Sequence, residues 1–403
     1  MGRTRPTILQ IIPSLDTGGA ELSTAEIAEA IVDAGGRALV ATEGGRLADR
    51  IAKAGGEVII FPAASKNPFR VIANAATLKA MIEKENVALV HARSRAPAWS
   101  ALIASRCARI PFVTTYHGAY AEADRIKRFY NSVMARSDRV IANSGYTASL
   151  IEARYGTDKQ RIRVIYRGVD IERFRPDAIE AERIETLRRA WQIEPGQRIV
   201  LHPARLTSWK GQHVLLDASG LLAASGKLGS IVIVFAGDDQ GRKGYKNELI
   251  ARAASLGIAD HVRFPGHVSD IAAAFAAAHV AVVASIEPEA FGRTATEAQA
   301  LGCPVIATAI GAPPETVIPV RDGENGLGTG WLVTPGDPVA LAECLHRALA
   351  LSECERIALG ARARAHVAAK FTLEAMKQAT LAVYDELLGT RLASLTKTGT
   401  HSN

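Results

Sequence analysis

Short apolar runs alternate with longer amphipathic stretches along almost the whole chain. The runs are rich in Val, Ile and Leu and have the length of buried parallel strands, whereas the stretches between them, such as residues 21–32 and 67–85, carry apolar residues at helical spacing. The runs are TILQIIP, RALVAT, EVIIFP, ALVHA, PFVTTYH, RVIANS and RIRVIY in the first half, and RIVLHPA, IVIVFAG, HVRFPG, VAVVAS, PVIATA and GWLVTP in the second. This alternation predicts an α/β protein whose parallel sheets are covered by helices on both faces.

The strands fall into two series separated by a polar break. The break, residues 172–197, is charged and contains Pro176 and Pro195, so we expect a linker there between two doubly wound, Rossmann-like domains. A TIM barrel would need eight regular units without such a break. We therefore expect an N-terminal domain over 1–180, a C-terminal domain over 195–370, a helix over 371–390 that crosses back to the N-terminal domain, and a disordered tail over 391–403.

Composition supports this organisation and argues against a membrane-spanning protein. The chain has 403 residues, of which 48% are hydrophobic, enough for two domains of ordinary size. No apolar run reaches the roughly 18–20 residues of a membrane span. The N-terminal MGRTRPTILQIIPSL is interrupted by Gln10 and Pro13, and we interpret it as a first strand rather than a signal peptide. The four cysteines show no metal-binding spacing, which favours a reducing cytoplasm.

Positive charge is concentrated in the first half of the chain. Residues 1–190 contain 29 Lys and Arg against 21 Asp and Glu, a net +8, whereas residues 191–403 contain 19 against 20, a net −1. The excess suggests an anionic acceptor or an anionic membrane surface on the N-terminal side. A basic surface that serves only solubility is the alternative.

The segment EPEAFGRTATEAQALGCPVIAT, residues 287–308, carries the most chemical information. It predicts a loop with an acid, a helix that begins near Gly292, and a short strand. The N-terminus of a helix offers backbone N–H groups and a positive dipole end that suit a diphosphate. Glu289 and Glu297 would repel phosphate but can accept hydrogen bonds from sugar and ribose hydroxyl groups. The segment therefore indicates a nucleotide-sugar site.

Three further motifs follow predicted strands, where ligands of open α/β sheets bind. Gly18 and Gly19 follow the first strand, and such a pair lets backbone amides approach an anion, although a plain turn is the alternative. His117 follows the fifth strand, at a position that favours function over the commoner structural role. Arg205 and Lys210 in HPARLTSWKGQ could stabilise a pyrophosphate leaving group without a metal, or be two solvated cations.

These motifs, in this order, resemble those of the GT-B glycosyltransferases, specifically the large retaining family 4 of the glycosyl transferases group 1. The resemblance extends from the GGAE turn to the terminal helices. Its most specific elements are R-x4-K at 205–210 and E-x7-E at 289–297, followed by ALGCPVIAT. It implies a GT-B fold of two facing Rossmann-like domains, with an N-terminal acceptor domain and a C-terminal donor domain.

The resemblance implies a role for each matching residue. Glu289 would bind hydroxyl groups of the donor sugar, and Glu297 would bind those of the ribose. Arg205 and Lys210 would neutralise the diphosphate, and His117 would contact the donor sugar near the reacting centre. The remaining donor-binding residues implied are Phe291 and Gly292 through their backbone with that of Ala290, Arg293 and Thr294 through their amides, Gly18 and Gly19 over the phosphates or the acceptor, and Gly266 and His267 beside the nucleobase.

The family's usual mechanism needs neither a metal nor another cofactor. The donor phosphate takes the proton of the acceptor hydroxyl on the face that this hydroxyl attacks, so configuration is retained and no protein nucleophile is required. Asp-x-Asp does not occur in this sequence, and Asp238-Asp239 is a weak metal signal. We therefore expect a hexosyltransferase that uses a nucleoside-diphosphate sugar, GDP-mannose or a UDP-sugar, and no metal.

The acceptor is expected to be an anionic glycan or glycolipid, with no nucleic acid as a partner. Arg93 and Arg95 in HARSRAPAW follow the fourth strand and are candidates for contacting it. The basic segment 122–139 could rest on an anionic membrane or grip an acidic sugar, or be an ordinary solvated helix face. The sequences IIPSLDTGGAELS, HARSRAPAW and TYHG are similar to those of bacterial lipopolysaccharide-core transferases, which suggests work at the inner face of the cytoplasmic membrane.

The chain departs from the family pattern at three places, and rival functions remain. Ala204 replaces a usual glycine, Gly311-Ala312-Pro313-Pro314-Glu315 replaces Gly-Gly-x-Pro-Glu, and Arg167 replaces the Asn of Asn-Gly-Val-Asp.

A UDP-sugar 2-epimerase on the same fold would turn over donor without acceptor. A sucrose- or trehalose-type synthase would use soluble sugars, and a catalytically silent nucleotide-sugar sensor would show no transfer. A nicotinamide dehydrogenase is disfavoured because the glycine fingerprint is incomplete.

Overall fold

The chain folds into two compact units in the computed structural model, which describes residues 5–16, 18–118, 120, 124–241, 243–321 and 327–395. Unit 1 comprises residues 1–168 and 373–403, and unit 2 comprises residues 169–372. In the described part of the chain, no helix combines the length and the apolar character needed to cross a bilayer.

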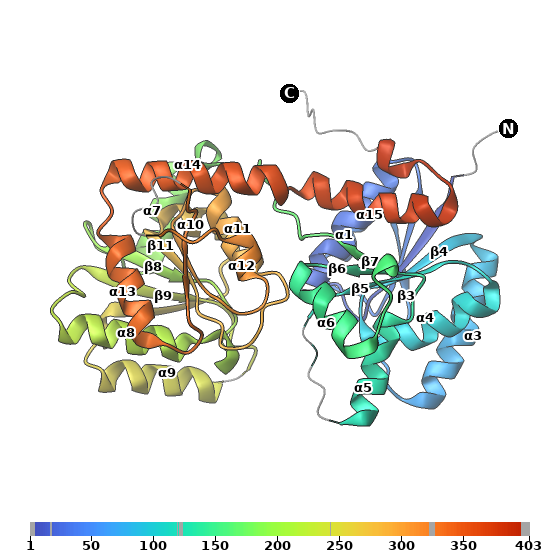
Figure 1. Ribbon diagram of the computed structural model, residues 1–403, viewed down its shortest axis with the longest axis horizontal. Helices are drawn as coiled ribbons and strands as arrows, with labels where there is room; N and C mark the ends of the chain where they lie inside the picture. Colours follow the sequence, from blue (N-terminus) through green and yellow to red (C-terminus); the bar gives the residue numbers. More distant parts are fainter. Residues whose placement is uncertain are drawn as a thin grey trace. The chain divides into compact units, whose positions relative to one another are not determined.

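Unit 1 is built, within its described residues, on a seven-stranded parallel sheet with the strand order β3-β2-β1-β4-β5-β6-β7 (Figure 1). The strands are β1 (Thr7–Ile11), β2 (Arg37–Thr42), β3 (Glu57–Ile60), β4 (Val87–Ala92), β5 (Phe112–Tyr116), β6 (Arg139–Ala142) and β7 (Ile162–Val164). They coincide with the seven apolar runs of the first half, so this part of the prediction is confirmed. Successive side chains point to opposite faces, and Ile8 and Leu9 accordingly belong to two different core clusters.

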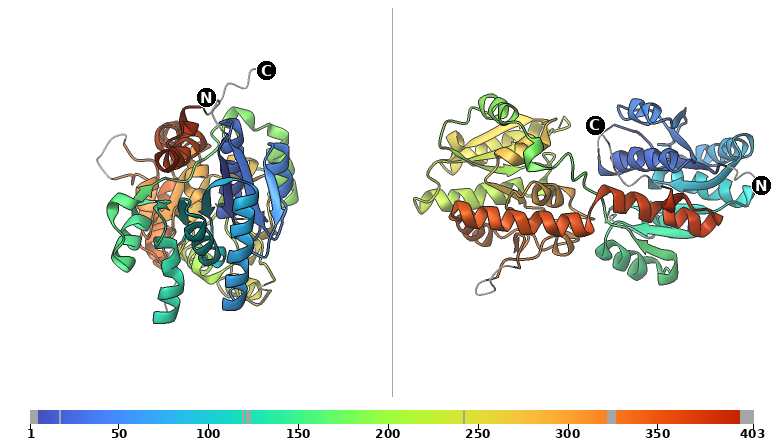
Figure 2. Two further views of the ribbon diagram at one scale, coloured as in Figure 1. Left: turned by 90° about the vertical axis from the view of Figure 1, so that its right-hand side faces the viewer. Right: turned by 90° about the horizontal axis from the view of Figure 1, so that it is seen from above.

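Helices cover both faces of this sheet (Figure 2). One core cluster includes residues of α1 (Gly19–Asp33), α2 (Ala48–Lys53) and α15 (Leu373–Leu388), and the other includes residues of α3 (Pro68–Lys84), α4 (Arg95–Ala108), the 3-10 helix η1 (Ser132–Ala135) and α6 (Gly145–Tyr155). The remaining helices of the unit are α5 (Arg125–Asn131), η2 (Lys159–Arg161) and η6 (Leu392–Ser394). The predicted basic helix over 122–139 is therefore split into α5 and η1, and residues 122 and 123 lie outside the described residues.

The last helix of the chain completes the core of unit 1. Helix α15 packs on α1 and β4, and its Tyr384 is fully buried with its hydroxyl 2.7 Å from His91 Nδ1. The expectation of a disordered tail from 391 is wrong for residues 391–395. There the Asp385 carboxylate accepts the backbone N–H groups of Leu392 at 2.7 Å and Ala393 at 2.8 Å, and these bonds hold η6 in place. Residues 396–403 lie outside the described residues.

Unit 2 contains, in the part described, a six-stranded parallel sheet with the order β10-β9-β8-β11-β12-β13. The strands are β8 (Arg198–His202), β9 (Ile231–Ala236), β10 (Val262–Gly266), β11 (Val280–Val283), β12 (Val305–Thr308) and β13 (Trp331–Val333). These are the six apolar runs of the second half, which confirms two Rossmann-like domains.

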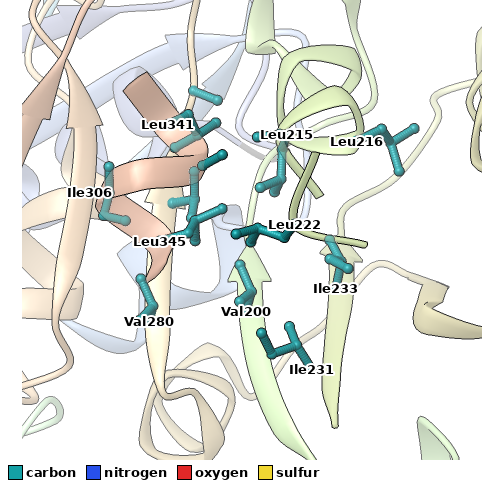
Figure 3. Packing of buried hydrophobic residues seen from close by; sticks show 14 of the residues in the cluster. Val200, Leu215, Leu216, Leu222, Ile231, Ile233, Val280, Ile306, Leu341 and Leu345 are labelled. Carbon is teal, nitrogen blue, oxygen red and sulfur yellow. The ribbon is translucent and has the colours of Figure 1, made fainter. Parts of the chain in front are cut away.

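The core of unit 2 joins the centre of this sheet to its covering helices. Leu215 of α8 and Leu345 of α13 lie over Val200 of β8 (Figure 3). The helices of the unit are η3 (Pro176–Ala178), α7 (Ala181–Ala190), η4 (Ser208–Lys210), α8 (Gln212–Ala224), α9 (Lys243–Ser255), η5 (Ala259–His261), α10 (Ile271–Ala277), α11 (Arg293–Ala300), α12 (Pro313–Thr316), α13 (Pro338–Leu349) and α14 (Glu353–Lys370).

The charged segment expected as a linker is part of unit 2. Its helix α7 packs on α10, and Arg183 makes a two-pronged ion pair with Asp270, with both N–O distances at 2.8 Å. The chain instead passes between the units at residues 168–169 and 372–373. The high charge and the two prolines of this segment therefore belong to the surface of unit 2 and not to a free linker.

In each unit the strand order reverses at one point along the sheet. The reversal lies between β1 and β4 in unit 1 and between β8 and β11 in unit 2. The connections from two such strands leave toward opposite faces, which opens a crevice at the carboxyl ends of the strands where α/β proteins bind ligands. The loops after these four strands carry most of the candidate site residues.

Candidate functional site

The loops after β8 and β11 leave the same edge of the unit 2 sheet side by side. The two strands are paired, with Val200 opposite Val280, and the loops are tied where the backbone N–H of Ile286 donates to the carbonyl of Trp209 at 2.8 Å. The first loop carries Arg205 and Lys210, and the second carries Glu289. The sheet thus brings together residues that are about eighty positions apart in the sequence.

Lys210 and Glu289 form an ion pair at the centre of this edge. The Lys210 ammonium contacts Glu289 Oε1, and the two side chains are only 16% and 12% exposed. The Ser285 hydroxyl donates to the same carboxylate oxygen at 2.6 Å. The ammonium also lies 4.1 Å from the centre of the Trp209 ring, a favourable cation–π distance. The Glu289 carboxylate is therefore paired with a cation, oriented by two partners and largely shielded from solvent.

Glu289 is held by its backbone as well as by its side chain. Its backbone pairs with Gly311 as an isolated parallel bridge, and its carbonyl accepts the Ala312 N–H at 2.9 Å. Gly311 has φ +80°, and a Cβ atom there would lie 2.3 Å from the Glu289 carbonyl oxygen. The loop after β12 can approach Glu289 this closely only because residue 311 has no side chain.

The turn that presents Lys210 is fixed by His202 and Gly211. His202 Nε2 lies 3.0 Å from the Lys210 carbonyl, which can only accept, so this nitrogen carries the proton. Burial of the ring lowers the pKa of His202 to about 4, so it is neutral near pH 7. Gly211 has φ +72°, and a Cβ atom there would lie 1.9 Å from the Ala284 carbonyl. The glycine therefore permits close contact between the two loops.

Helix α11 begins beside Glu289, as the sequence predicted. Gly292 is its N-cap with φ +83°, and no side chain caps the helix in the described structure. The N-terminus of such a helix presents backbone amides, here those of Arg293 and Thr294, toward an anion. Glu297 lies one turn into the helix, with its Oε1 3.4 Å from Arg293 Nε. The Phe291 ring is buried against Phe371, at a centroid distance of 5.8 Å, so only the backbone of Phe291 can serve a ligand.

Two other predicted donor-binding elements lie along the same carboxyl edge. Arg205 is exposed, and among the described residues its guanidinium has no ion-pair or hydrogen-bond partner, while its carbonyl accepts from Gln212 at 2.9 Å. Gly266, with φ +79°, ends β10, and His267 is exposed immediately after it. Strand β10 is two strands from β8 in the same sheet, so both turns lie along one edge.

Unit 1 gathers its candidate residues at the carboxyl edge of its own sheet. Helix α1 begins at Gly19 with Gly18 as the N-cap, and no described side chain caps it. His117 follows β5, and its Nδ1 contacts the Arg167 guanidinium. Burial and the charges of Arg167 and Arg93 hold the pKa of His117 well below its usual range. His117 is therefore a neutral imidazole with Nδ1 as an acceptor and Nε2–H as a donor.

The two predicted acceptor arginines have different surroundings. Arg93 is buried, and it donates to Ser23 Oγ of α1 at 2.5 Å. Arg95 donates to Asn131 Oδ1 at 2.8 Å, and its guanidinium lies 3.9 Å from the centre of the Tyr120 ring. Arg93 thus lies beside His117 at the sheet edge, whereas Arg95 is committed to the start of α4 and the end of α5.

Among the residues that the structure describes, no group of three or more His, Cys, Asp or Glu side chains is arranged to hold a metal ion. Asp238 and Asp239 each accept a backbone N–H two residues ahead, from Gln240 and Gly241, at 2.8 Å. This acidic pair therefore stabilises a turn.

Sequence reasoning missed several residues that build the site. Ser285 gave no signal, because serine after a strand is common. His202 and Gly311 lay within segments that departed from the family pattern, but their contacts with Lys210 and Glu289 depend on the packing of three separate loops. Trp209 contacts Lys210, its neighbour in the sequence. Its position directly before the lysine is a signal from which this contact could have been predicted.

Comparison with known families adds to this geometry. The family model described as Glycosyltransferase Family 4 matches residues 17–173, and the model described as Glycosyl transferases group 1 matches residues 183–366. The two matches correspond closely to the two units of the structure.

Solved structures and curated proteins give the same result. A glycosyltransferase from Rickettsia africae ESF-5 is 33% identical, with a TM-score of 0.86, over 96% of this chain and 100% of that chain. Alr3699/HepE from Anabaena, in complex with UDP and glucose, is 27% identical, with a TM-score of 0.79, over 94% and 99%. A D-inositol 3-phosphate glycosyltransferase of Streptomyces bingchenggensis (strain BCW-1) is 34% identical over 262 residues, which are 64% of this chain and 54% of that protein. The match thus spans about half the length of such curated relatives.

Replacing Gly311 by alanine should disturb the site more than its backbone conformation alone explains. Gly311 and Gly336 have similar positive φ values, +80° and +73°, but a Cβ atom has nothing within 4 Å at Gly336. Gly336→Ala should cost about 1–2 kcal/mol, from the left-handed conformation alone. Gly311→Ala should cost more, because the Glu289 backbone must also move. Chemical denaturation of the two variants measures the difference, and equal losses would show that the Glu289–Gly311 contact imposes no constraint.

Acidification should destabilise the protein through His202. Its folded pKa of about 4 lies below the usual value of about 6.5, so the folded state resists protonation. The corresponding stability is present above about pH 6.5 and is lost as the pH falls toward 4, by up to about 1.4 kcal/mol per pH unit. His279, whose pKa is also lowered to about 4, acts in the same direction. Unfolding free energies from pH 7 to 4.5 should therefore fall less steeply in His202→Gln than in wild type, and identical slopes would contradict this role.

Proposed function

We propose a reaction for this chain, which belongs to the glycosyl transferases group 1 family and is a GT-B glycosyltransferase. It transfers a hexose from a nucleoside-diphosphate sugar with retention of configuration and without a metal. The observation that carries this proposal is the Lys210–Glu289 pair beside the uncapped N-terminus of α11. This arrangement offers cations and amides to a diphosphate and a carboxylate to the sugar, at one edge of one sheet.

The proposed reaction uses the donor itself as the base. The acceptor oxygen bonds to the anomeric carbon of the sugar as the bond from that carbon to the β-phosphate oxygen breaks, and the acceptor proton passes to a phosphate oxygen. Arg205, Lys210 and the amides of Arg293 and Thr294 stabilise the negative charge that grows on the leaving diphosphate. Lys210 can do so while paired, because an ammonium has three donors and Glu289 engages one.

The sugar and the nucleoside are assigned to the carboxylates and the outer loops. Glu289 accepts hydrogen bonds from sugar hydroxyls, and Glu297 accepts those of the ribose. The base lies near Gly266 and His267. UDP-glucose is the first donor to test, because Alr3699/HepE, at 27% and 26% identity in different complexes, was solved with UDP and glucose and with UDP-glucose. GDP-mannose is the second.

The proposed acceptor is an anionic glycan or glycolipid, of which a lipopolysaccharide core is one example. The net charge of +8 over residues 1–190 supports an anionic partner for the N-terminal half. The name of the curated relatives, D-inositol 3-phosphate glycosyltransferase, supports a phosphate-bearing acceptor as an equally direct candidate. Both candidates carry negative charge.

Peripheral contact with an anionic membrane, at its cytoplasmic face, forms part of the proposal. Two helices on either side of α4 expose large apolar side chains: Ile126 of α5 is 82% exposed and Phe69 of α3 is 84% exposed. Helix α4 joins them, since its Ser100 hydroxyl donates to the Val71 carbonyl of α3 at 2.9 Å and the rings of Trp99 and Phe129 stack at 5.1 Å. The basic residues around this surface are Lys66, Arg70, Arg125, Lys127, Arg128 and Arg136. Apolar side chains surrounded by cations suit an anionic bilayer.

Loss of either member of the central ion pair should abolish most of the activity. Glu289→Gln and Lys210→Ala should each lower the rate of sugar transfer at least ~100-fold, as expected when one contact to the transition state is lost. The assay measures nucleotide release from UDP-glucose or GDP-mannose with EDTA present. Lys227→Ala and Glu248→Gln, exposed residues of unit 2 away from the site, are the matched controls. Wild-type rates in either site variant, or activity that EDTA removes, would contradict the proposal, and equal turnover without any acceptor would point to the epimerase.

Binding to anionic vesicles should depend on the apolar residues of α5. Full-length protein should sediment with vesicles that contain 30% phosphatidylglycerol and not with vesicles of phosphatidylcholine. An Ile126→Ser, Phe129→Ser double variant should bind at least about tenfold more weakly, because each buried apolar side chain contributes roughly 1.5–3 kcal/mol. Ile357→Ser, at an exposed position of α14 in unit 2, is the control. Equal sedimentation of all three proteins would exclude this surface.

A further inference from the structure

Two arginines are buried at the carboxyl edge of the unit 1 sheet. Arg93, which follows β4, is 2% exposed, and Arg167, which follows β7, is 6% exposed. Burying a guanidinium is costly, because it is permanently charged, unless an anion lies close to it. For Arg93, whose buried Nε has no hydrogen-bond partner in the described structure, this cost needs an explanation.

The partners of Arg93 are hydroxyl groups. Its Nη2 donates to Ser23 Oγ at 2.5 Å, and its Nη1 lies 3.5 Å from Thr115 Oγ1, while its buried Nε has no hydrogen-bond partner. Among the described residues, no carboxylate lies within ion-pair distance of Arg93, although Glu26 and the Tyr384 hydroxyl act on it from further away. Burial accordingly lowers the pKa of Arg93 to about 10. Its charge is only partly compensated by the protein.

Two histidines extend this cluster without adding charge. His91 lies 2.7 Å from both the Tyr384 hydroxyl and Thr115 Oγ1, and His117 contacts Arg167. Burial and the charges of both arginines hold the pKa values of the two imidazoles well below their usual range. The buried His117 Nε2 makes no hydrogen bond of ordinary geometry in the described structure, although the Arg93 backbone acts on the ring as an acceptor. His117 thus lies next to two guanidinium groups as a neutral ring.

The cluster lies where the fold places ligands. Arg93 follows β4, next to β1 at the reversal of strand order, and Ser23 belongs to α1, whose N-terminus carries no side-chain cap among the described residues. An anion here would meet two guanidinium groups and a neutral imidazole, which recognise a phosphate or a carboxylate by charge-assisted hydrogen bonds. It would lie away from the first turn of α1, where the Glu21 carboxylate sits beside Gly18.

We propose that Arg93 and Arg167 form a binding site for an oxyanion, a phosphate or a carboxylate, carried by one of the two substrates of the transferase. That the carrier is a substrate rests on the proposed function, whereas binding of the anion does not. The carrier is the acceptor when it bears a phosphate or an acidic sugar, and the donor when its sugar is a uronic acid. Arg167 thereby gains a role at the position where the sequence departs from its family.

The first experiment measures binding of inorganic phosphate to the full chain by isothermal titration calorimetry, in buffer without other oxyanions and with EDTA. Arg93→Gln and Arg167→Asn should each weaken phosphate binding at least about tenfold, the effect of one lost charge-assisted hydrogen bond. Arg205→Gln tests whether the phosphate instead binds at the diphosphate site of unit 2. Arg109→Gln is the matched control, since Arg109 is an exposed arginine just past the far end of α4 from Arg93.

Loss of affinity confined to the two unit 1 variants would support the proposal. Equal affinity in all variants, or a loss in Arg205→Gln alone, would overturn it. Thermal unfolding shows whether each variant folds, and Arg167→Asn carries the test if Arg93→Gln does not. The titration needs no catalysis, so its result can be interpreted even if the protein does not transfer a sugar.

A second measurement identifies the carrier. Transfer from UDP-glucose is compared between a sugar acceptor and its phosphate monoester, and UDP-glucuronate is compared with UDP-glucose as donor. Arg93→Gln should remove the preference for the charged acceptor if the acceptor is the carrier, or the preference for the charged donor if the donor is. If Arg93→Gln prefers the charged acceptor and the charged donor as strongly as wild type does, the assignment is overturned.

Discussion

The architecture of the unit 2 site depends on one contact between loops, the pairing of Lys210 with Glu289. The lysine comes from the loop after β8 and the glutamate from the loop after β11, and the backbone of Glu289 is bridged to Gly311 after β12. The loops after three adjacent strands are thereby tied to one residue, Glu289, two through its side chain or its own loop and the third through its backbone. Close approach of these loops requires glycine at 211 and at 311, because a Cβ atom at either position would lie within 2.3 Å of a carbonyl oxygen. The pair is therefore the contact that holds the loops after β8 and β11 together next to the start of α11.

The two units handle buried charge in opposite ways. In unit 2 a cation and an anion neutralise each other while 16% and 12% exposed, so a ligand that separates them must offer charge or hydrogen bonds in their place. In unit 1 two arginines are buried beside two neutral histidines, and Arg93 reaches hydroxyl groups and no close carboxylate in the described structure. The first arrangement suits a ligand with both phosphates and hydroxyls, and the second suits an anion. A transferase that joins a nucleotide sugar to a charged acceptor needs one of each.

Much of this fold could be predicted from the sequence, because the signals for its strands and helices are local. Apolar strand runs, helical spacing and the glycine before α11 each depend on a few neighbouring residues, and all thirteen strands lay where those patterns placed them. The motifs E-x7-E and R-x4-K are equally local patterns, and the roles assigned to their residues stay predictions. What the sequence did not reveal depends on contacts between distant segments. The hydrogen bond from Ser285 to Glu289, the bond from His202 to the Lys210 turn and the burial of Arg93 and Arg167 arise only when separate loops meet. The segment 172–197 was predicted as a linker because linkers and surface helices can both be rich in charge and contain proline. The packing of its helix α7 on α10 shows that it belongs to unit 2.

The most direct test of the central claim is a crystal structure of the protein with UDP-glucose, grown with EDTA. The account predicts the diphosphate within hydrogen-bond distance of Lys210 Nζ and of the amides of Arg293 and Thr294, with Glu289 contacting sugar hydroxyls and Glu297 contacting the ribose. A nucleotide bound elsewhere on unit 2, or a diphosphate turned away from the start of α11, would contradict it.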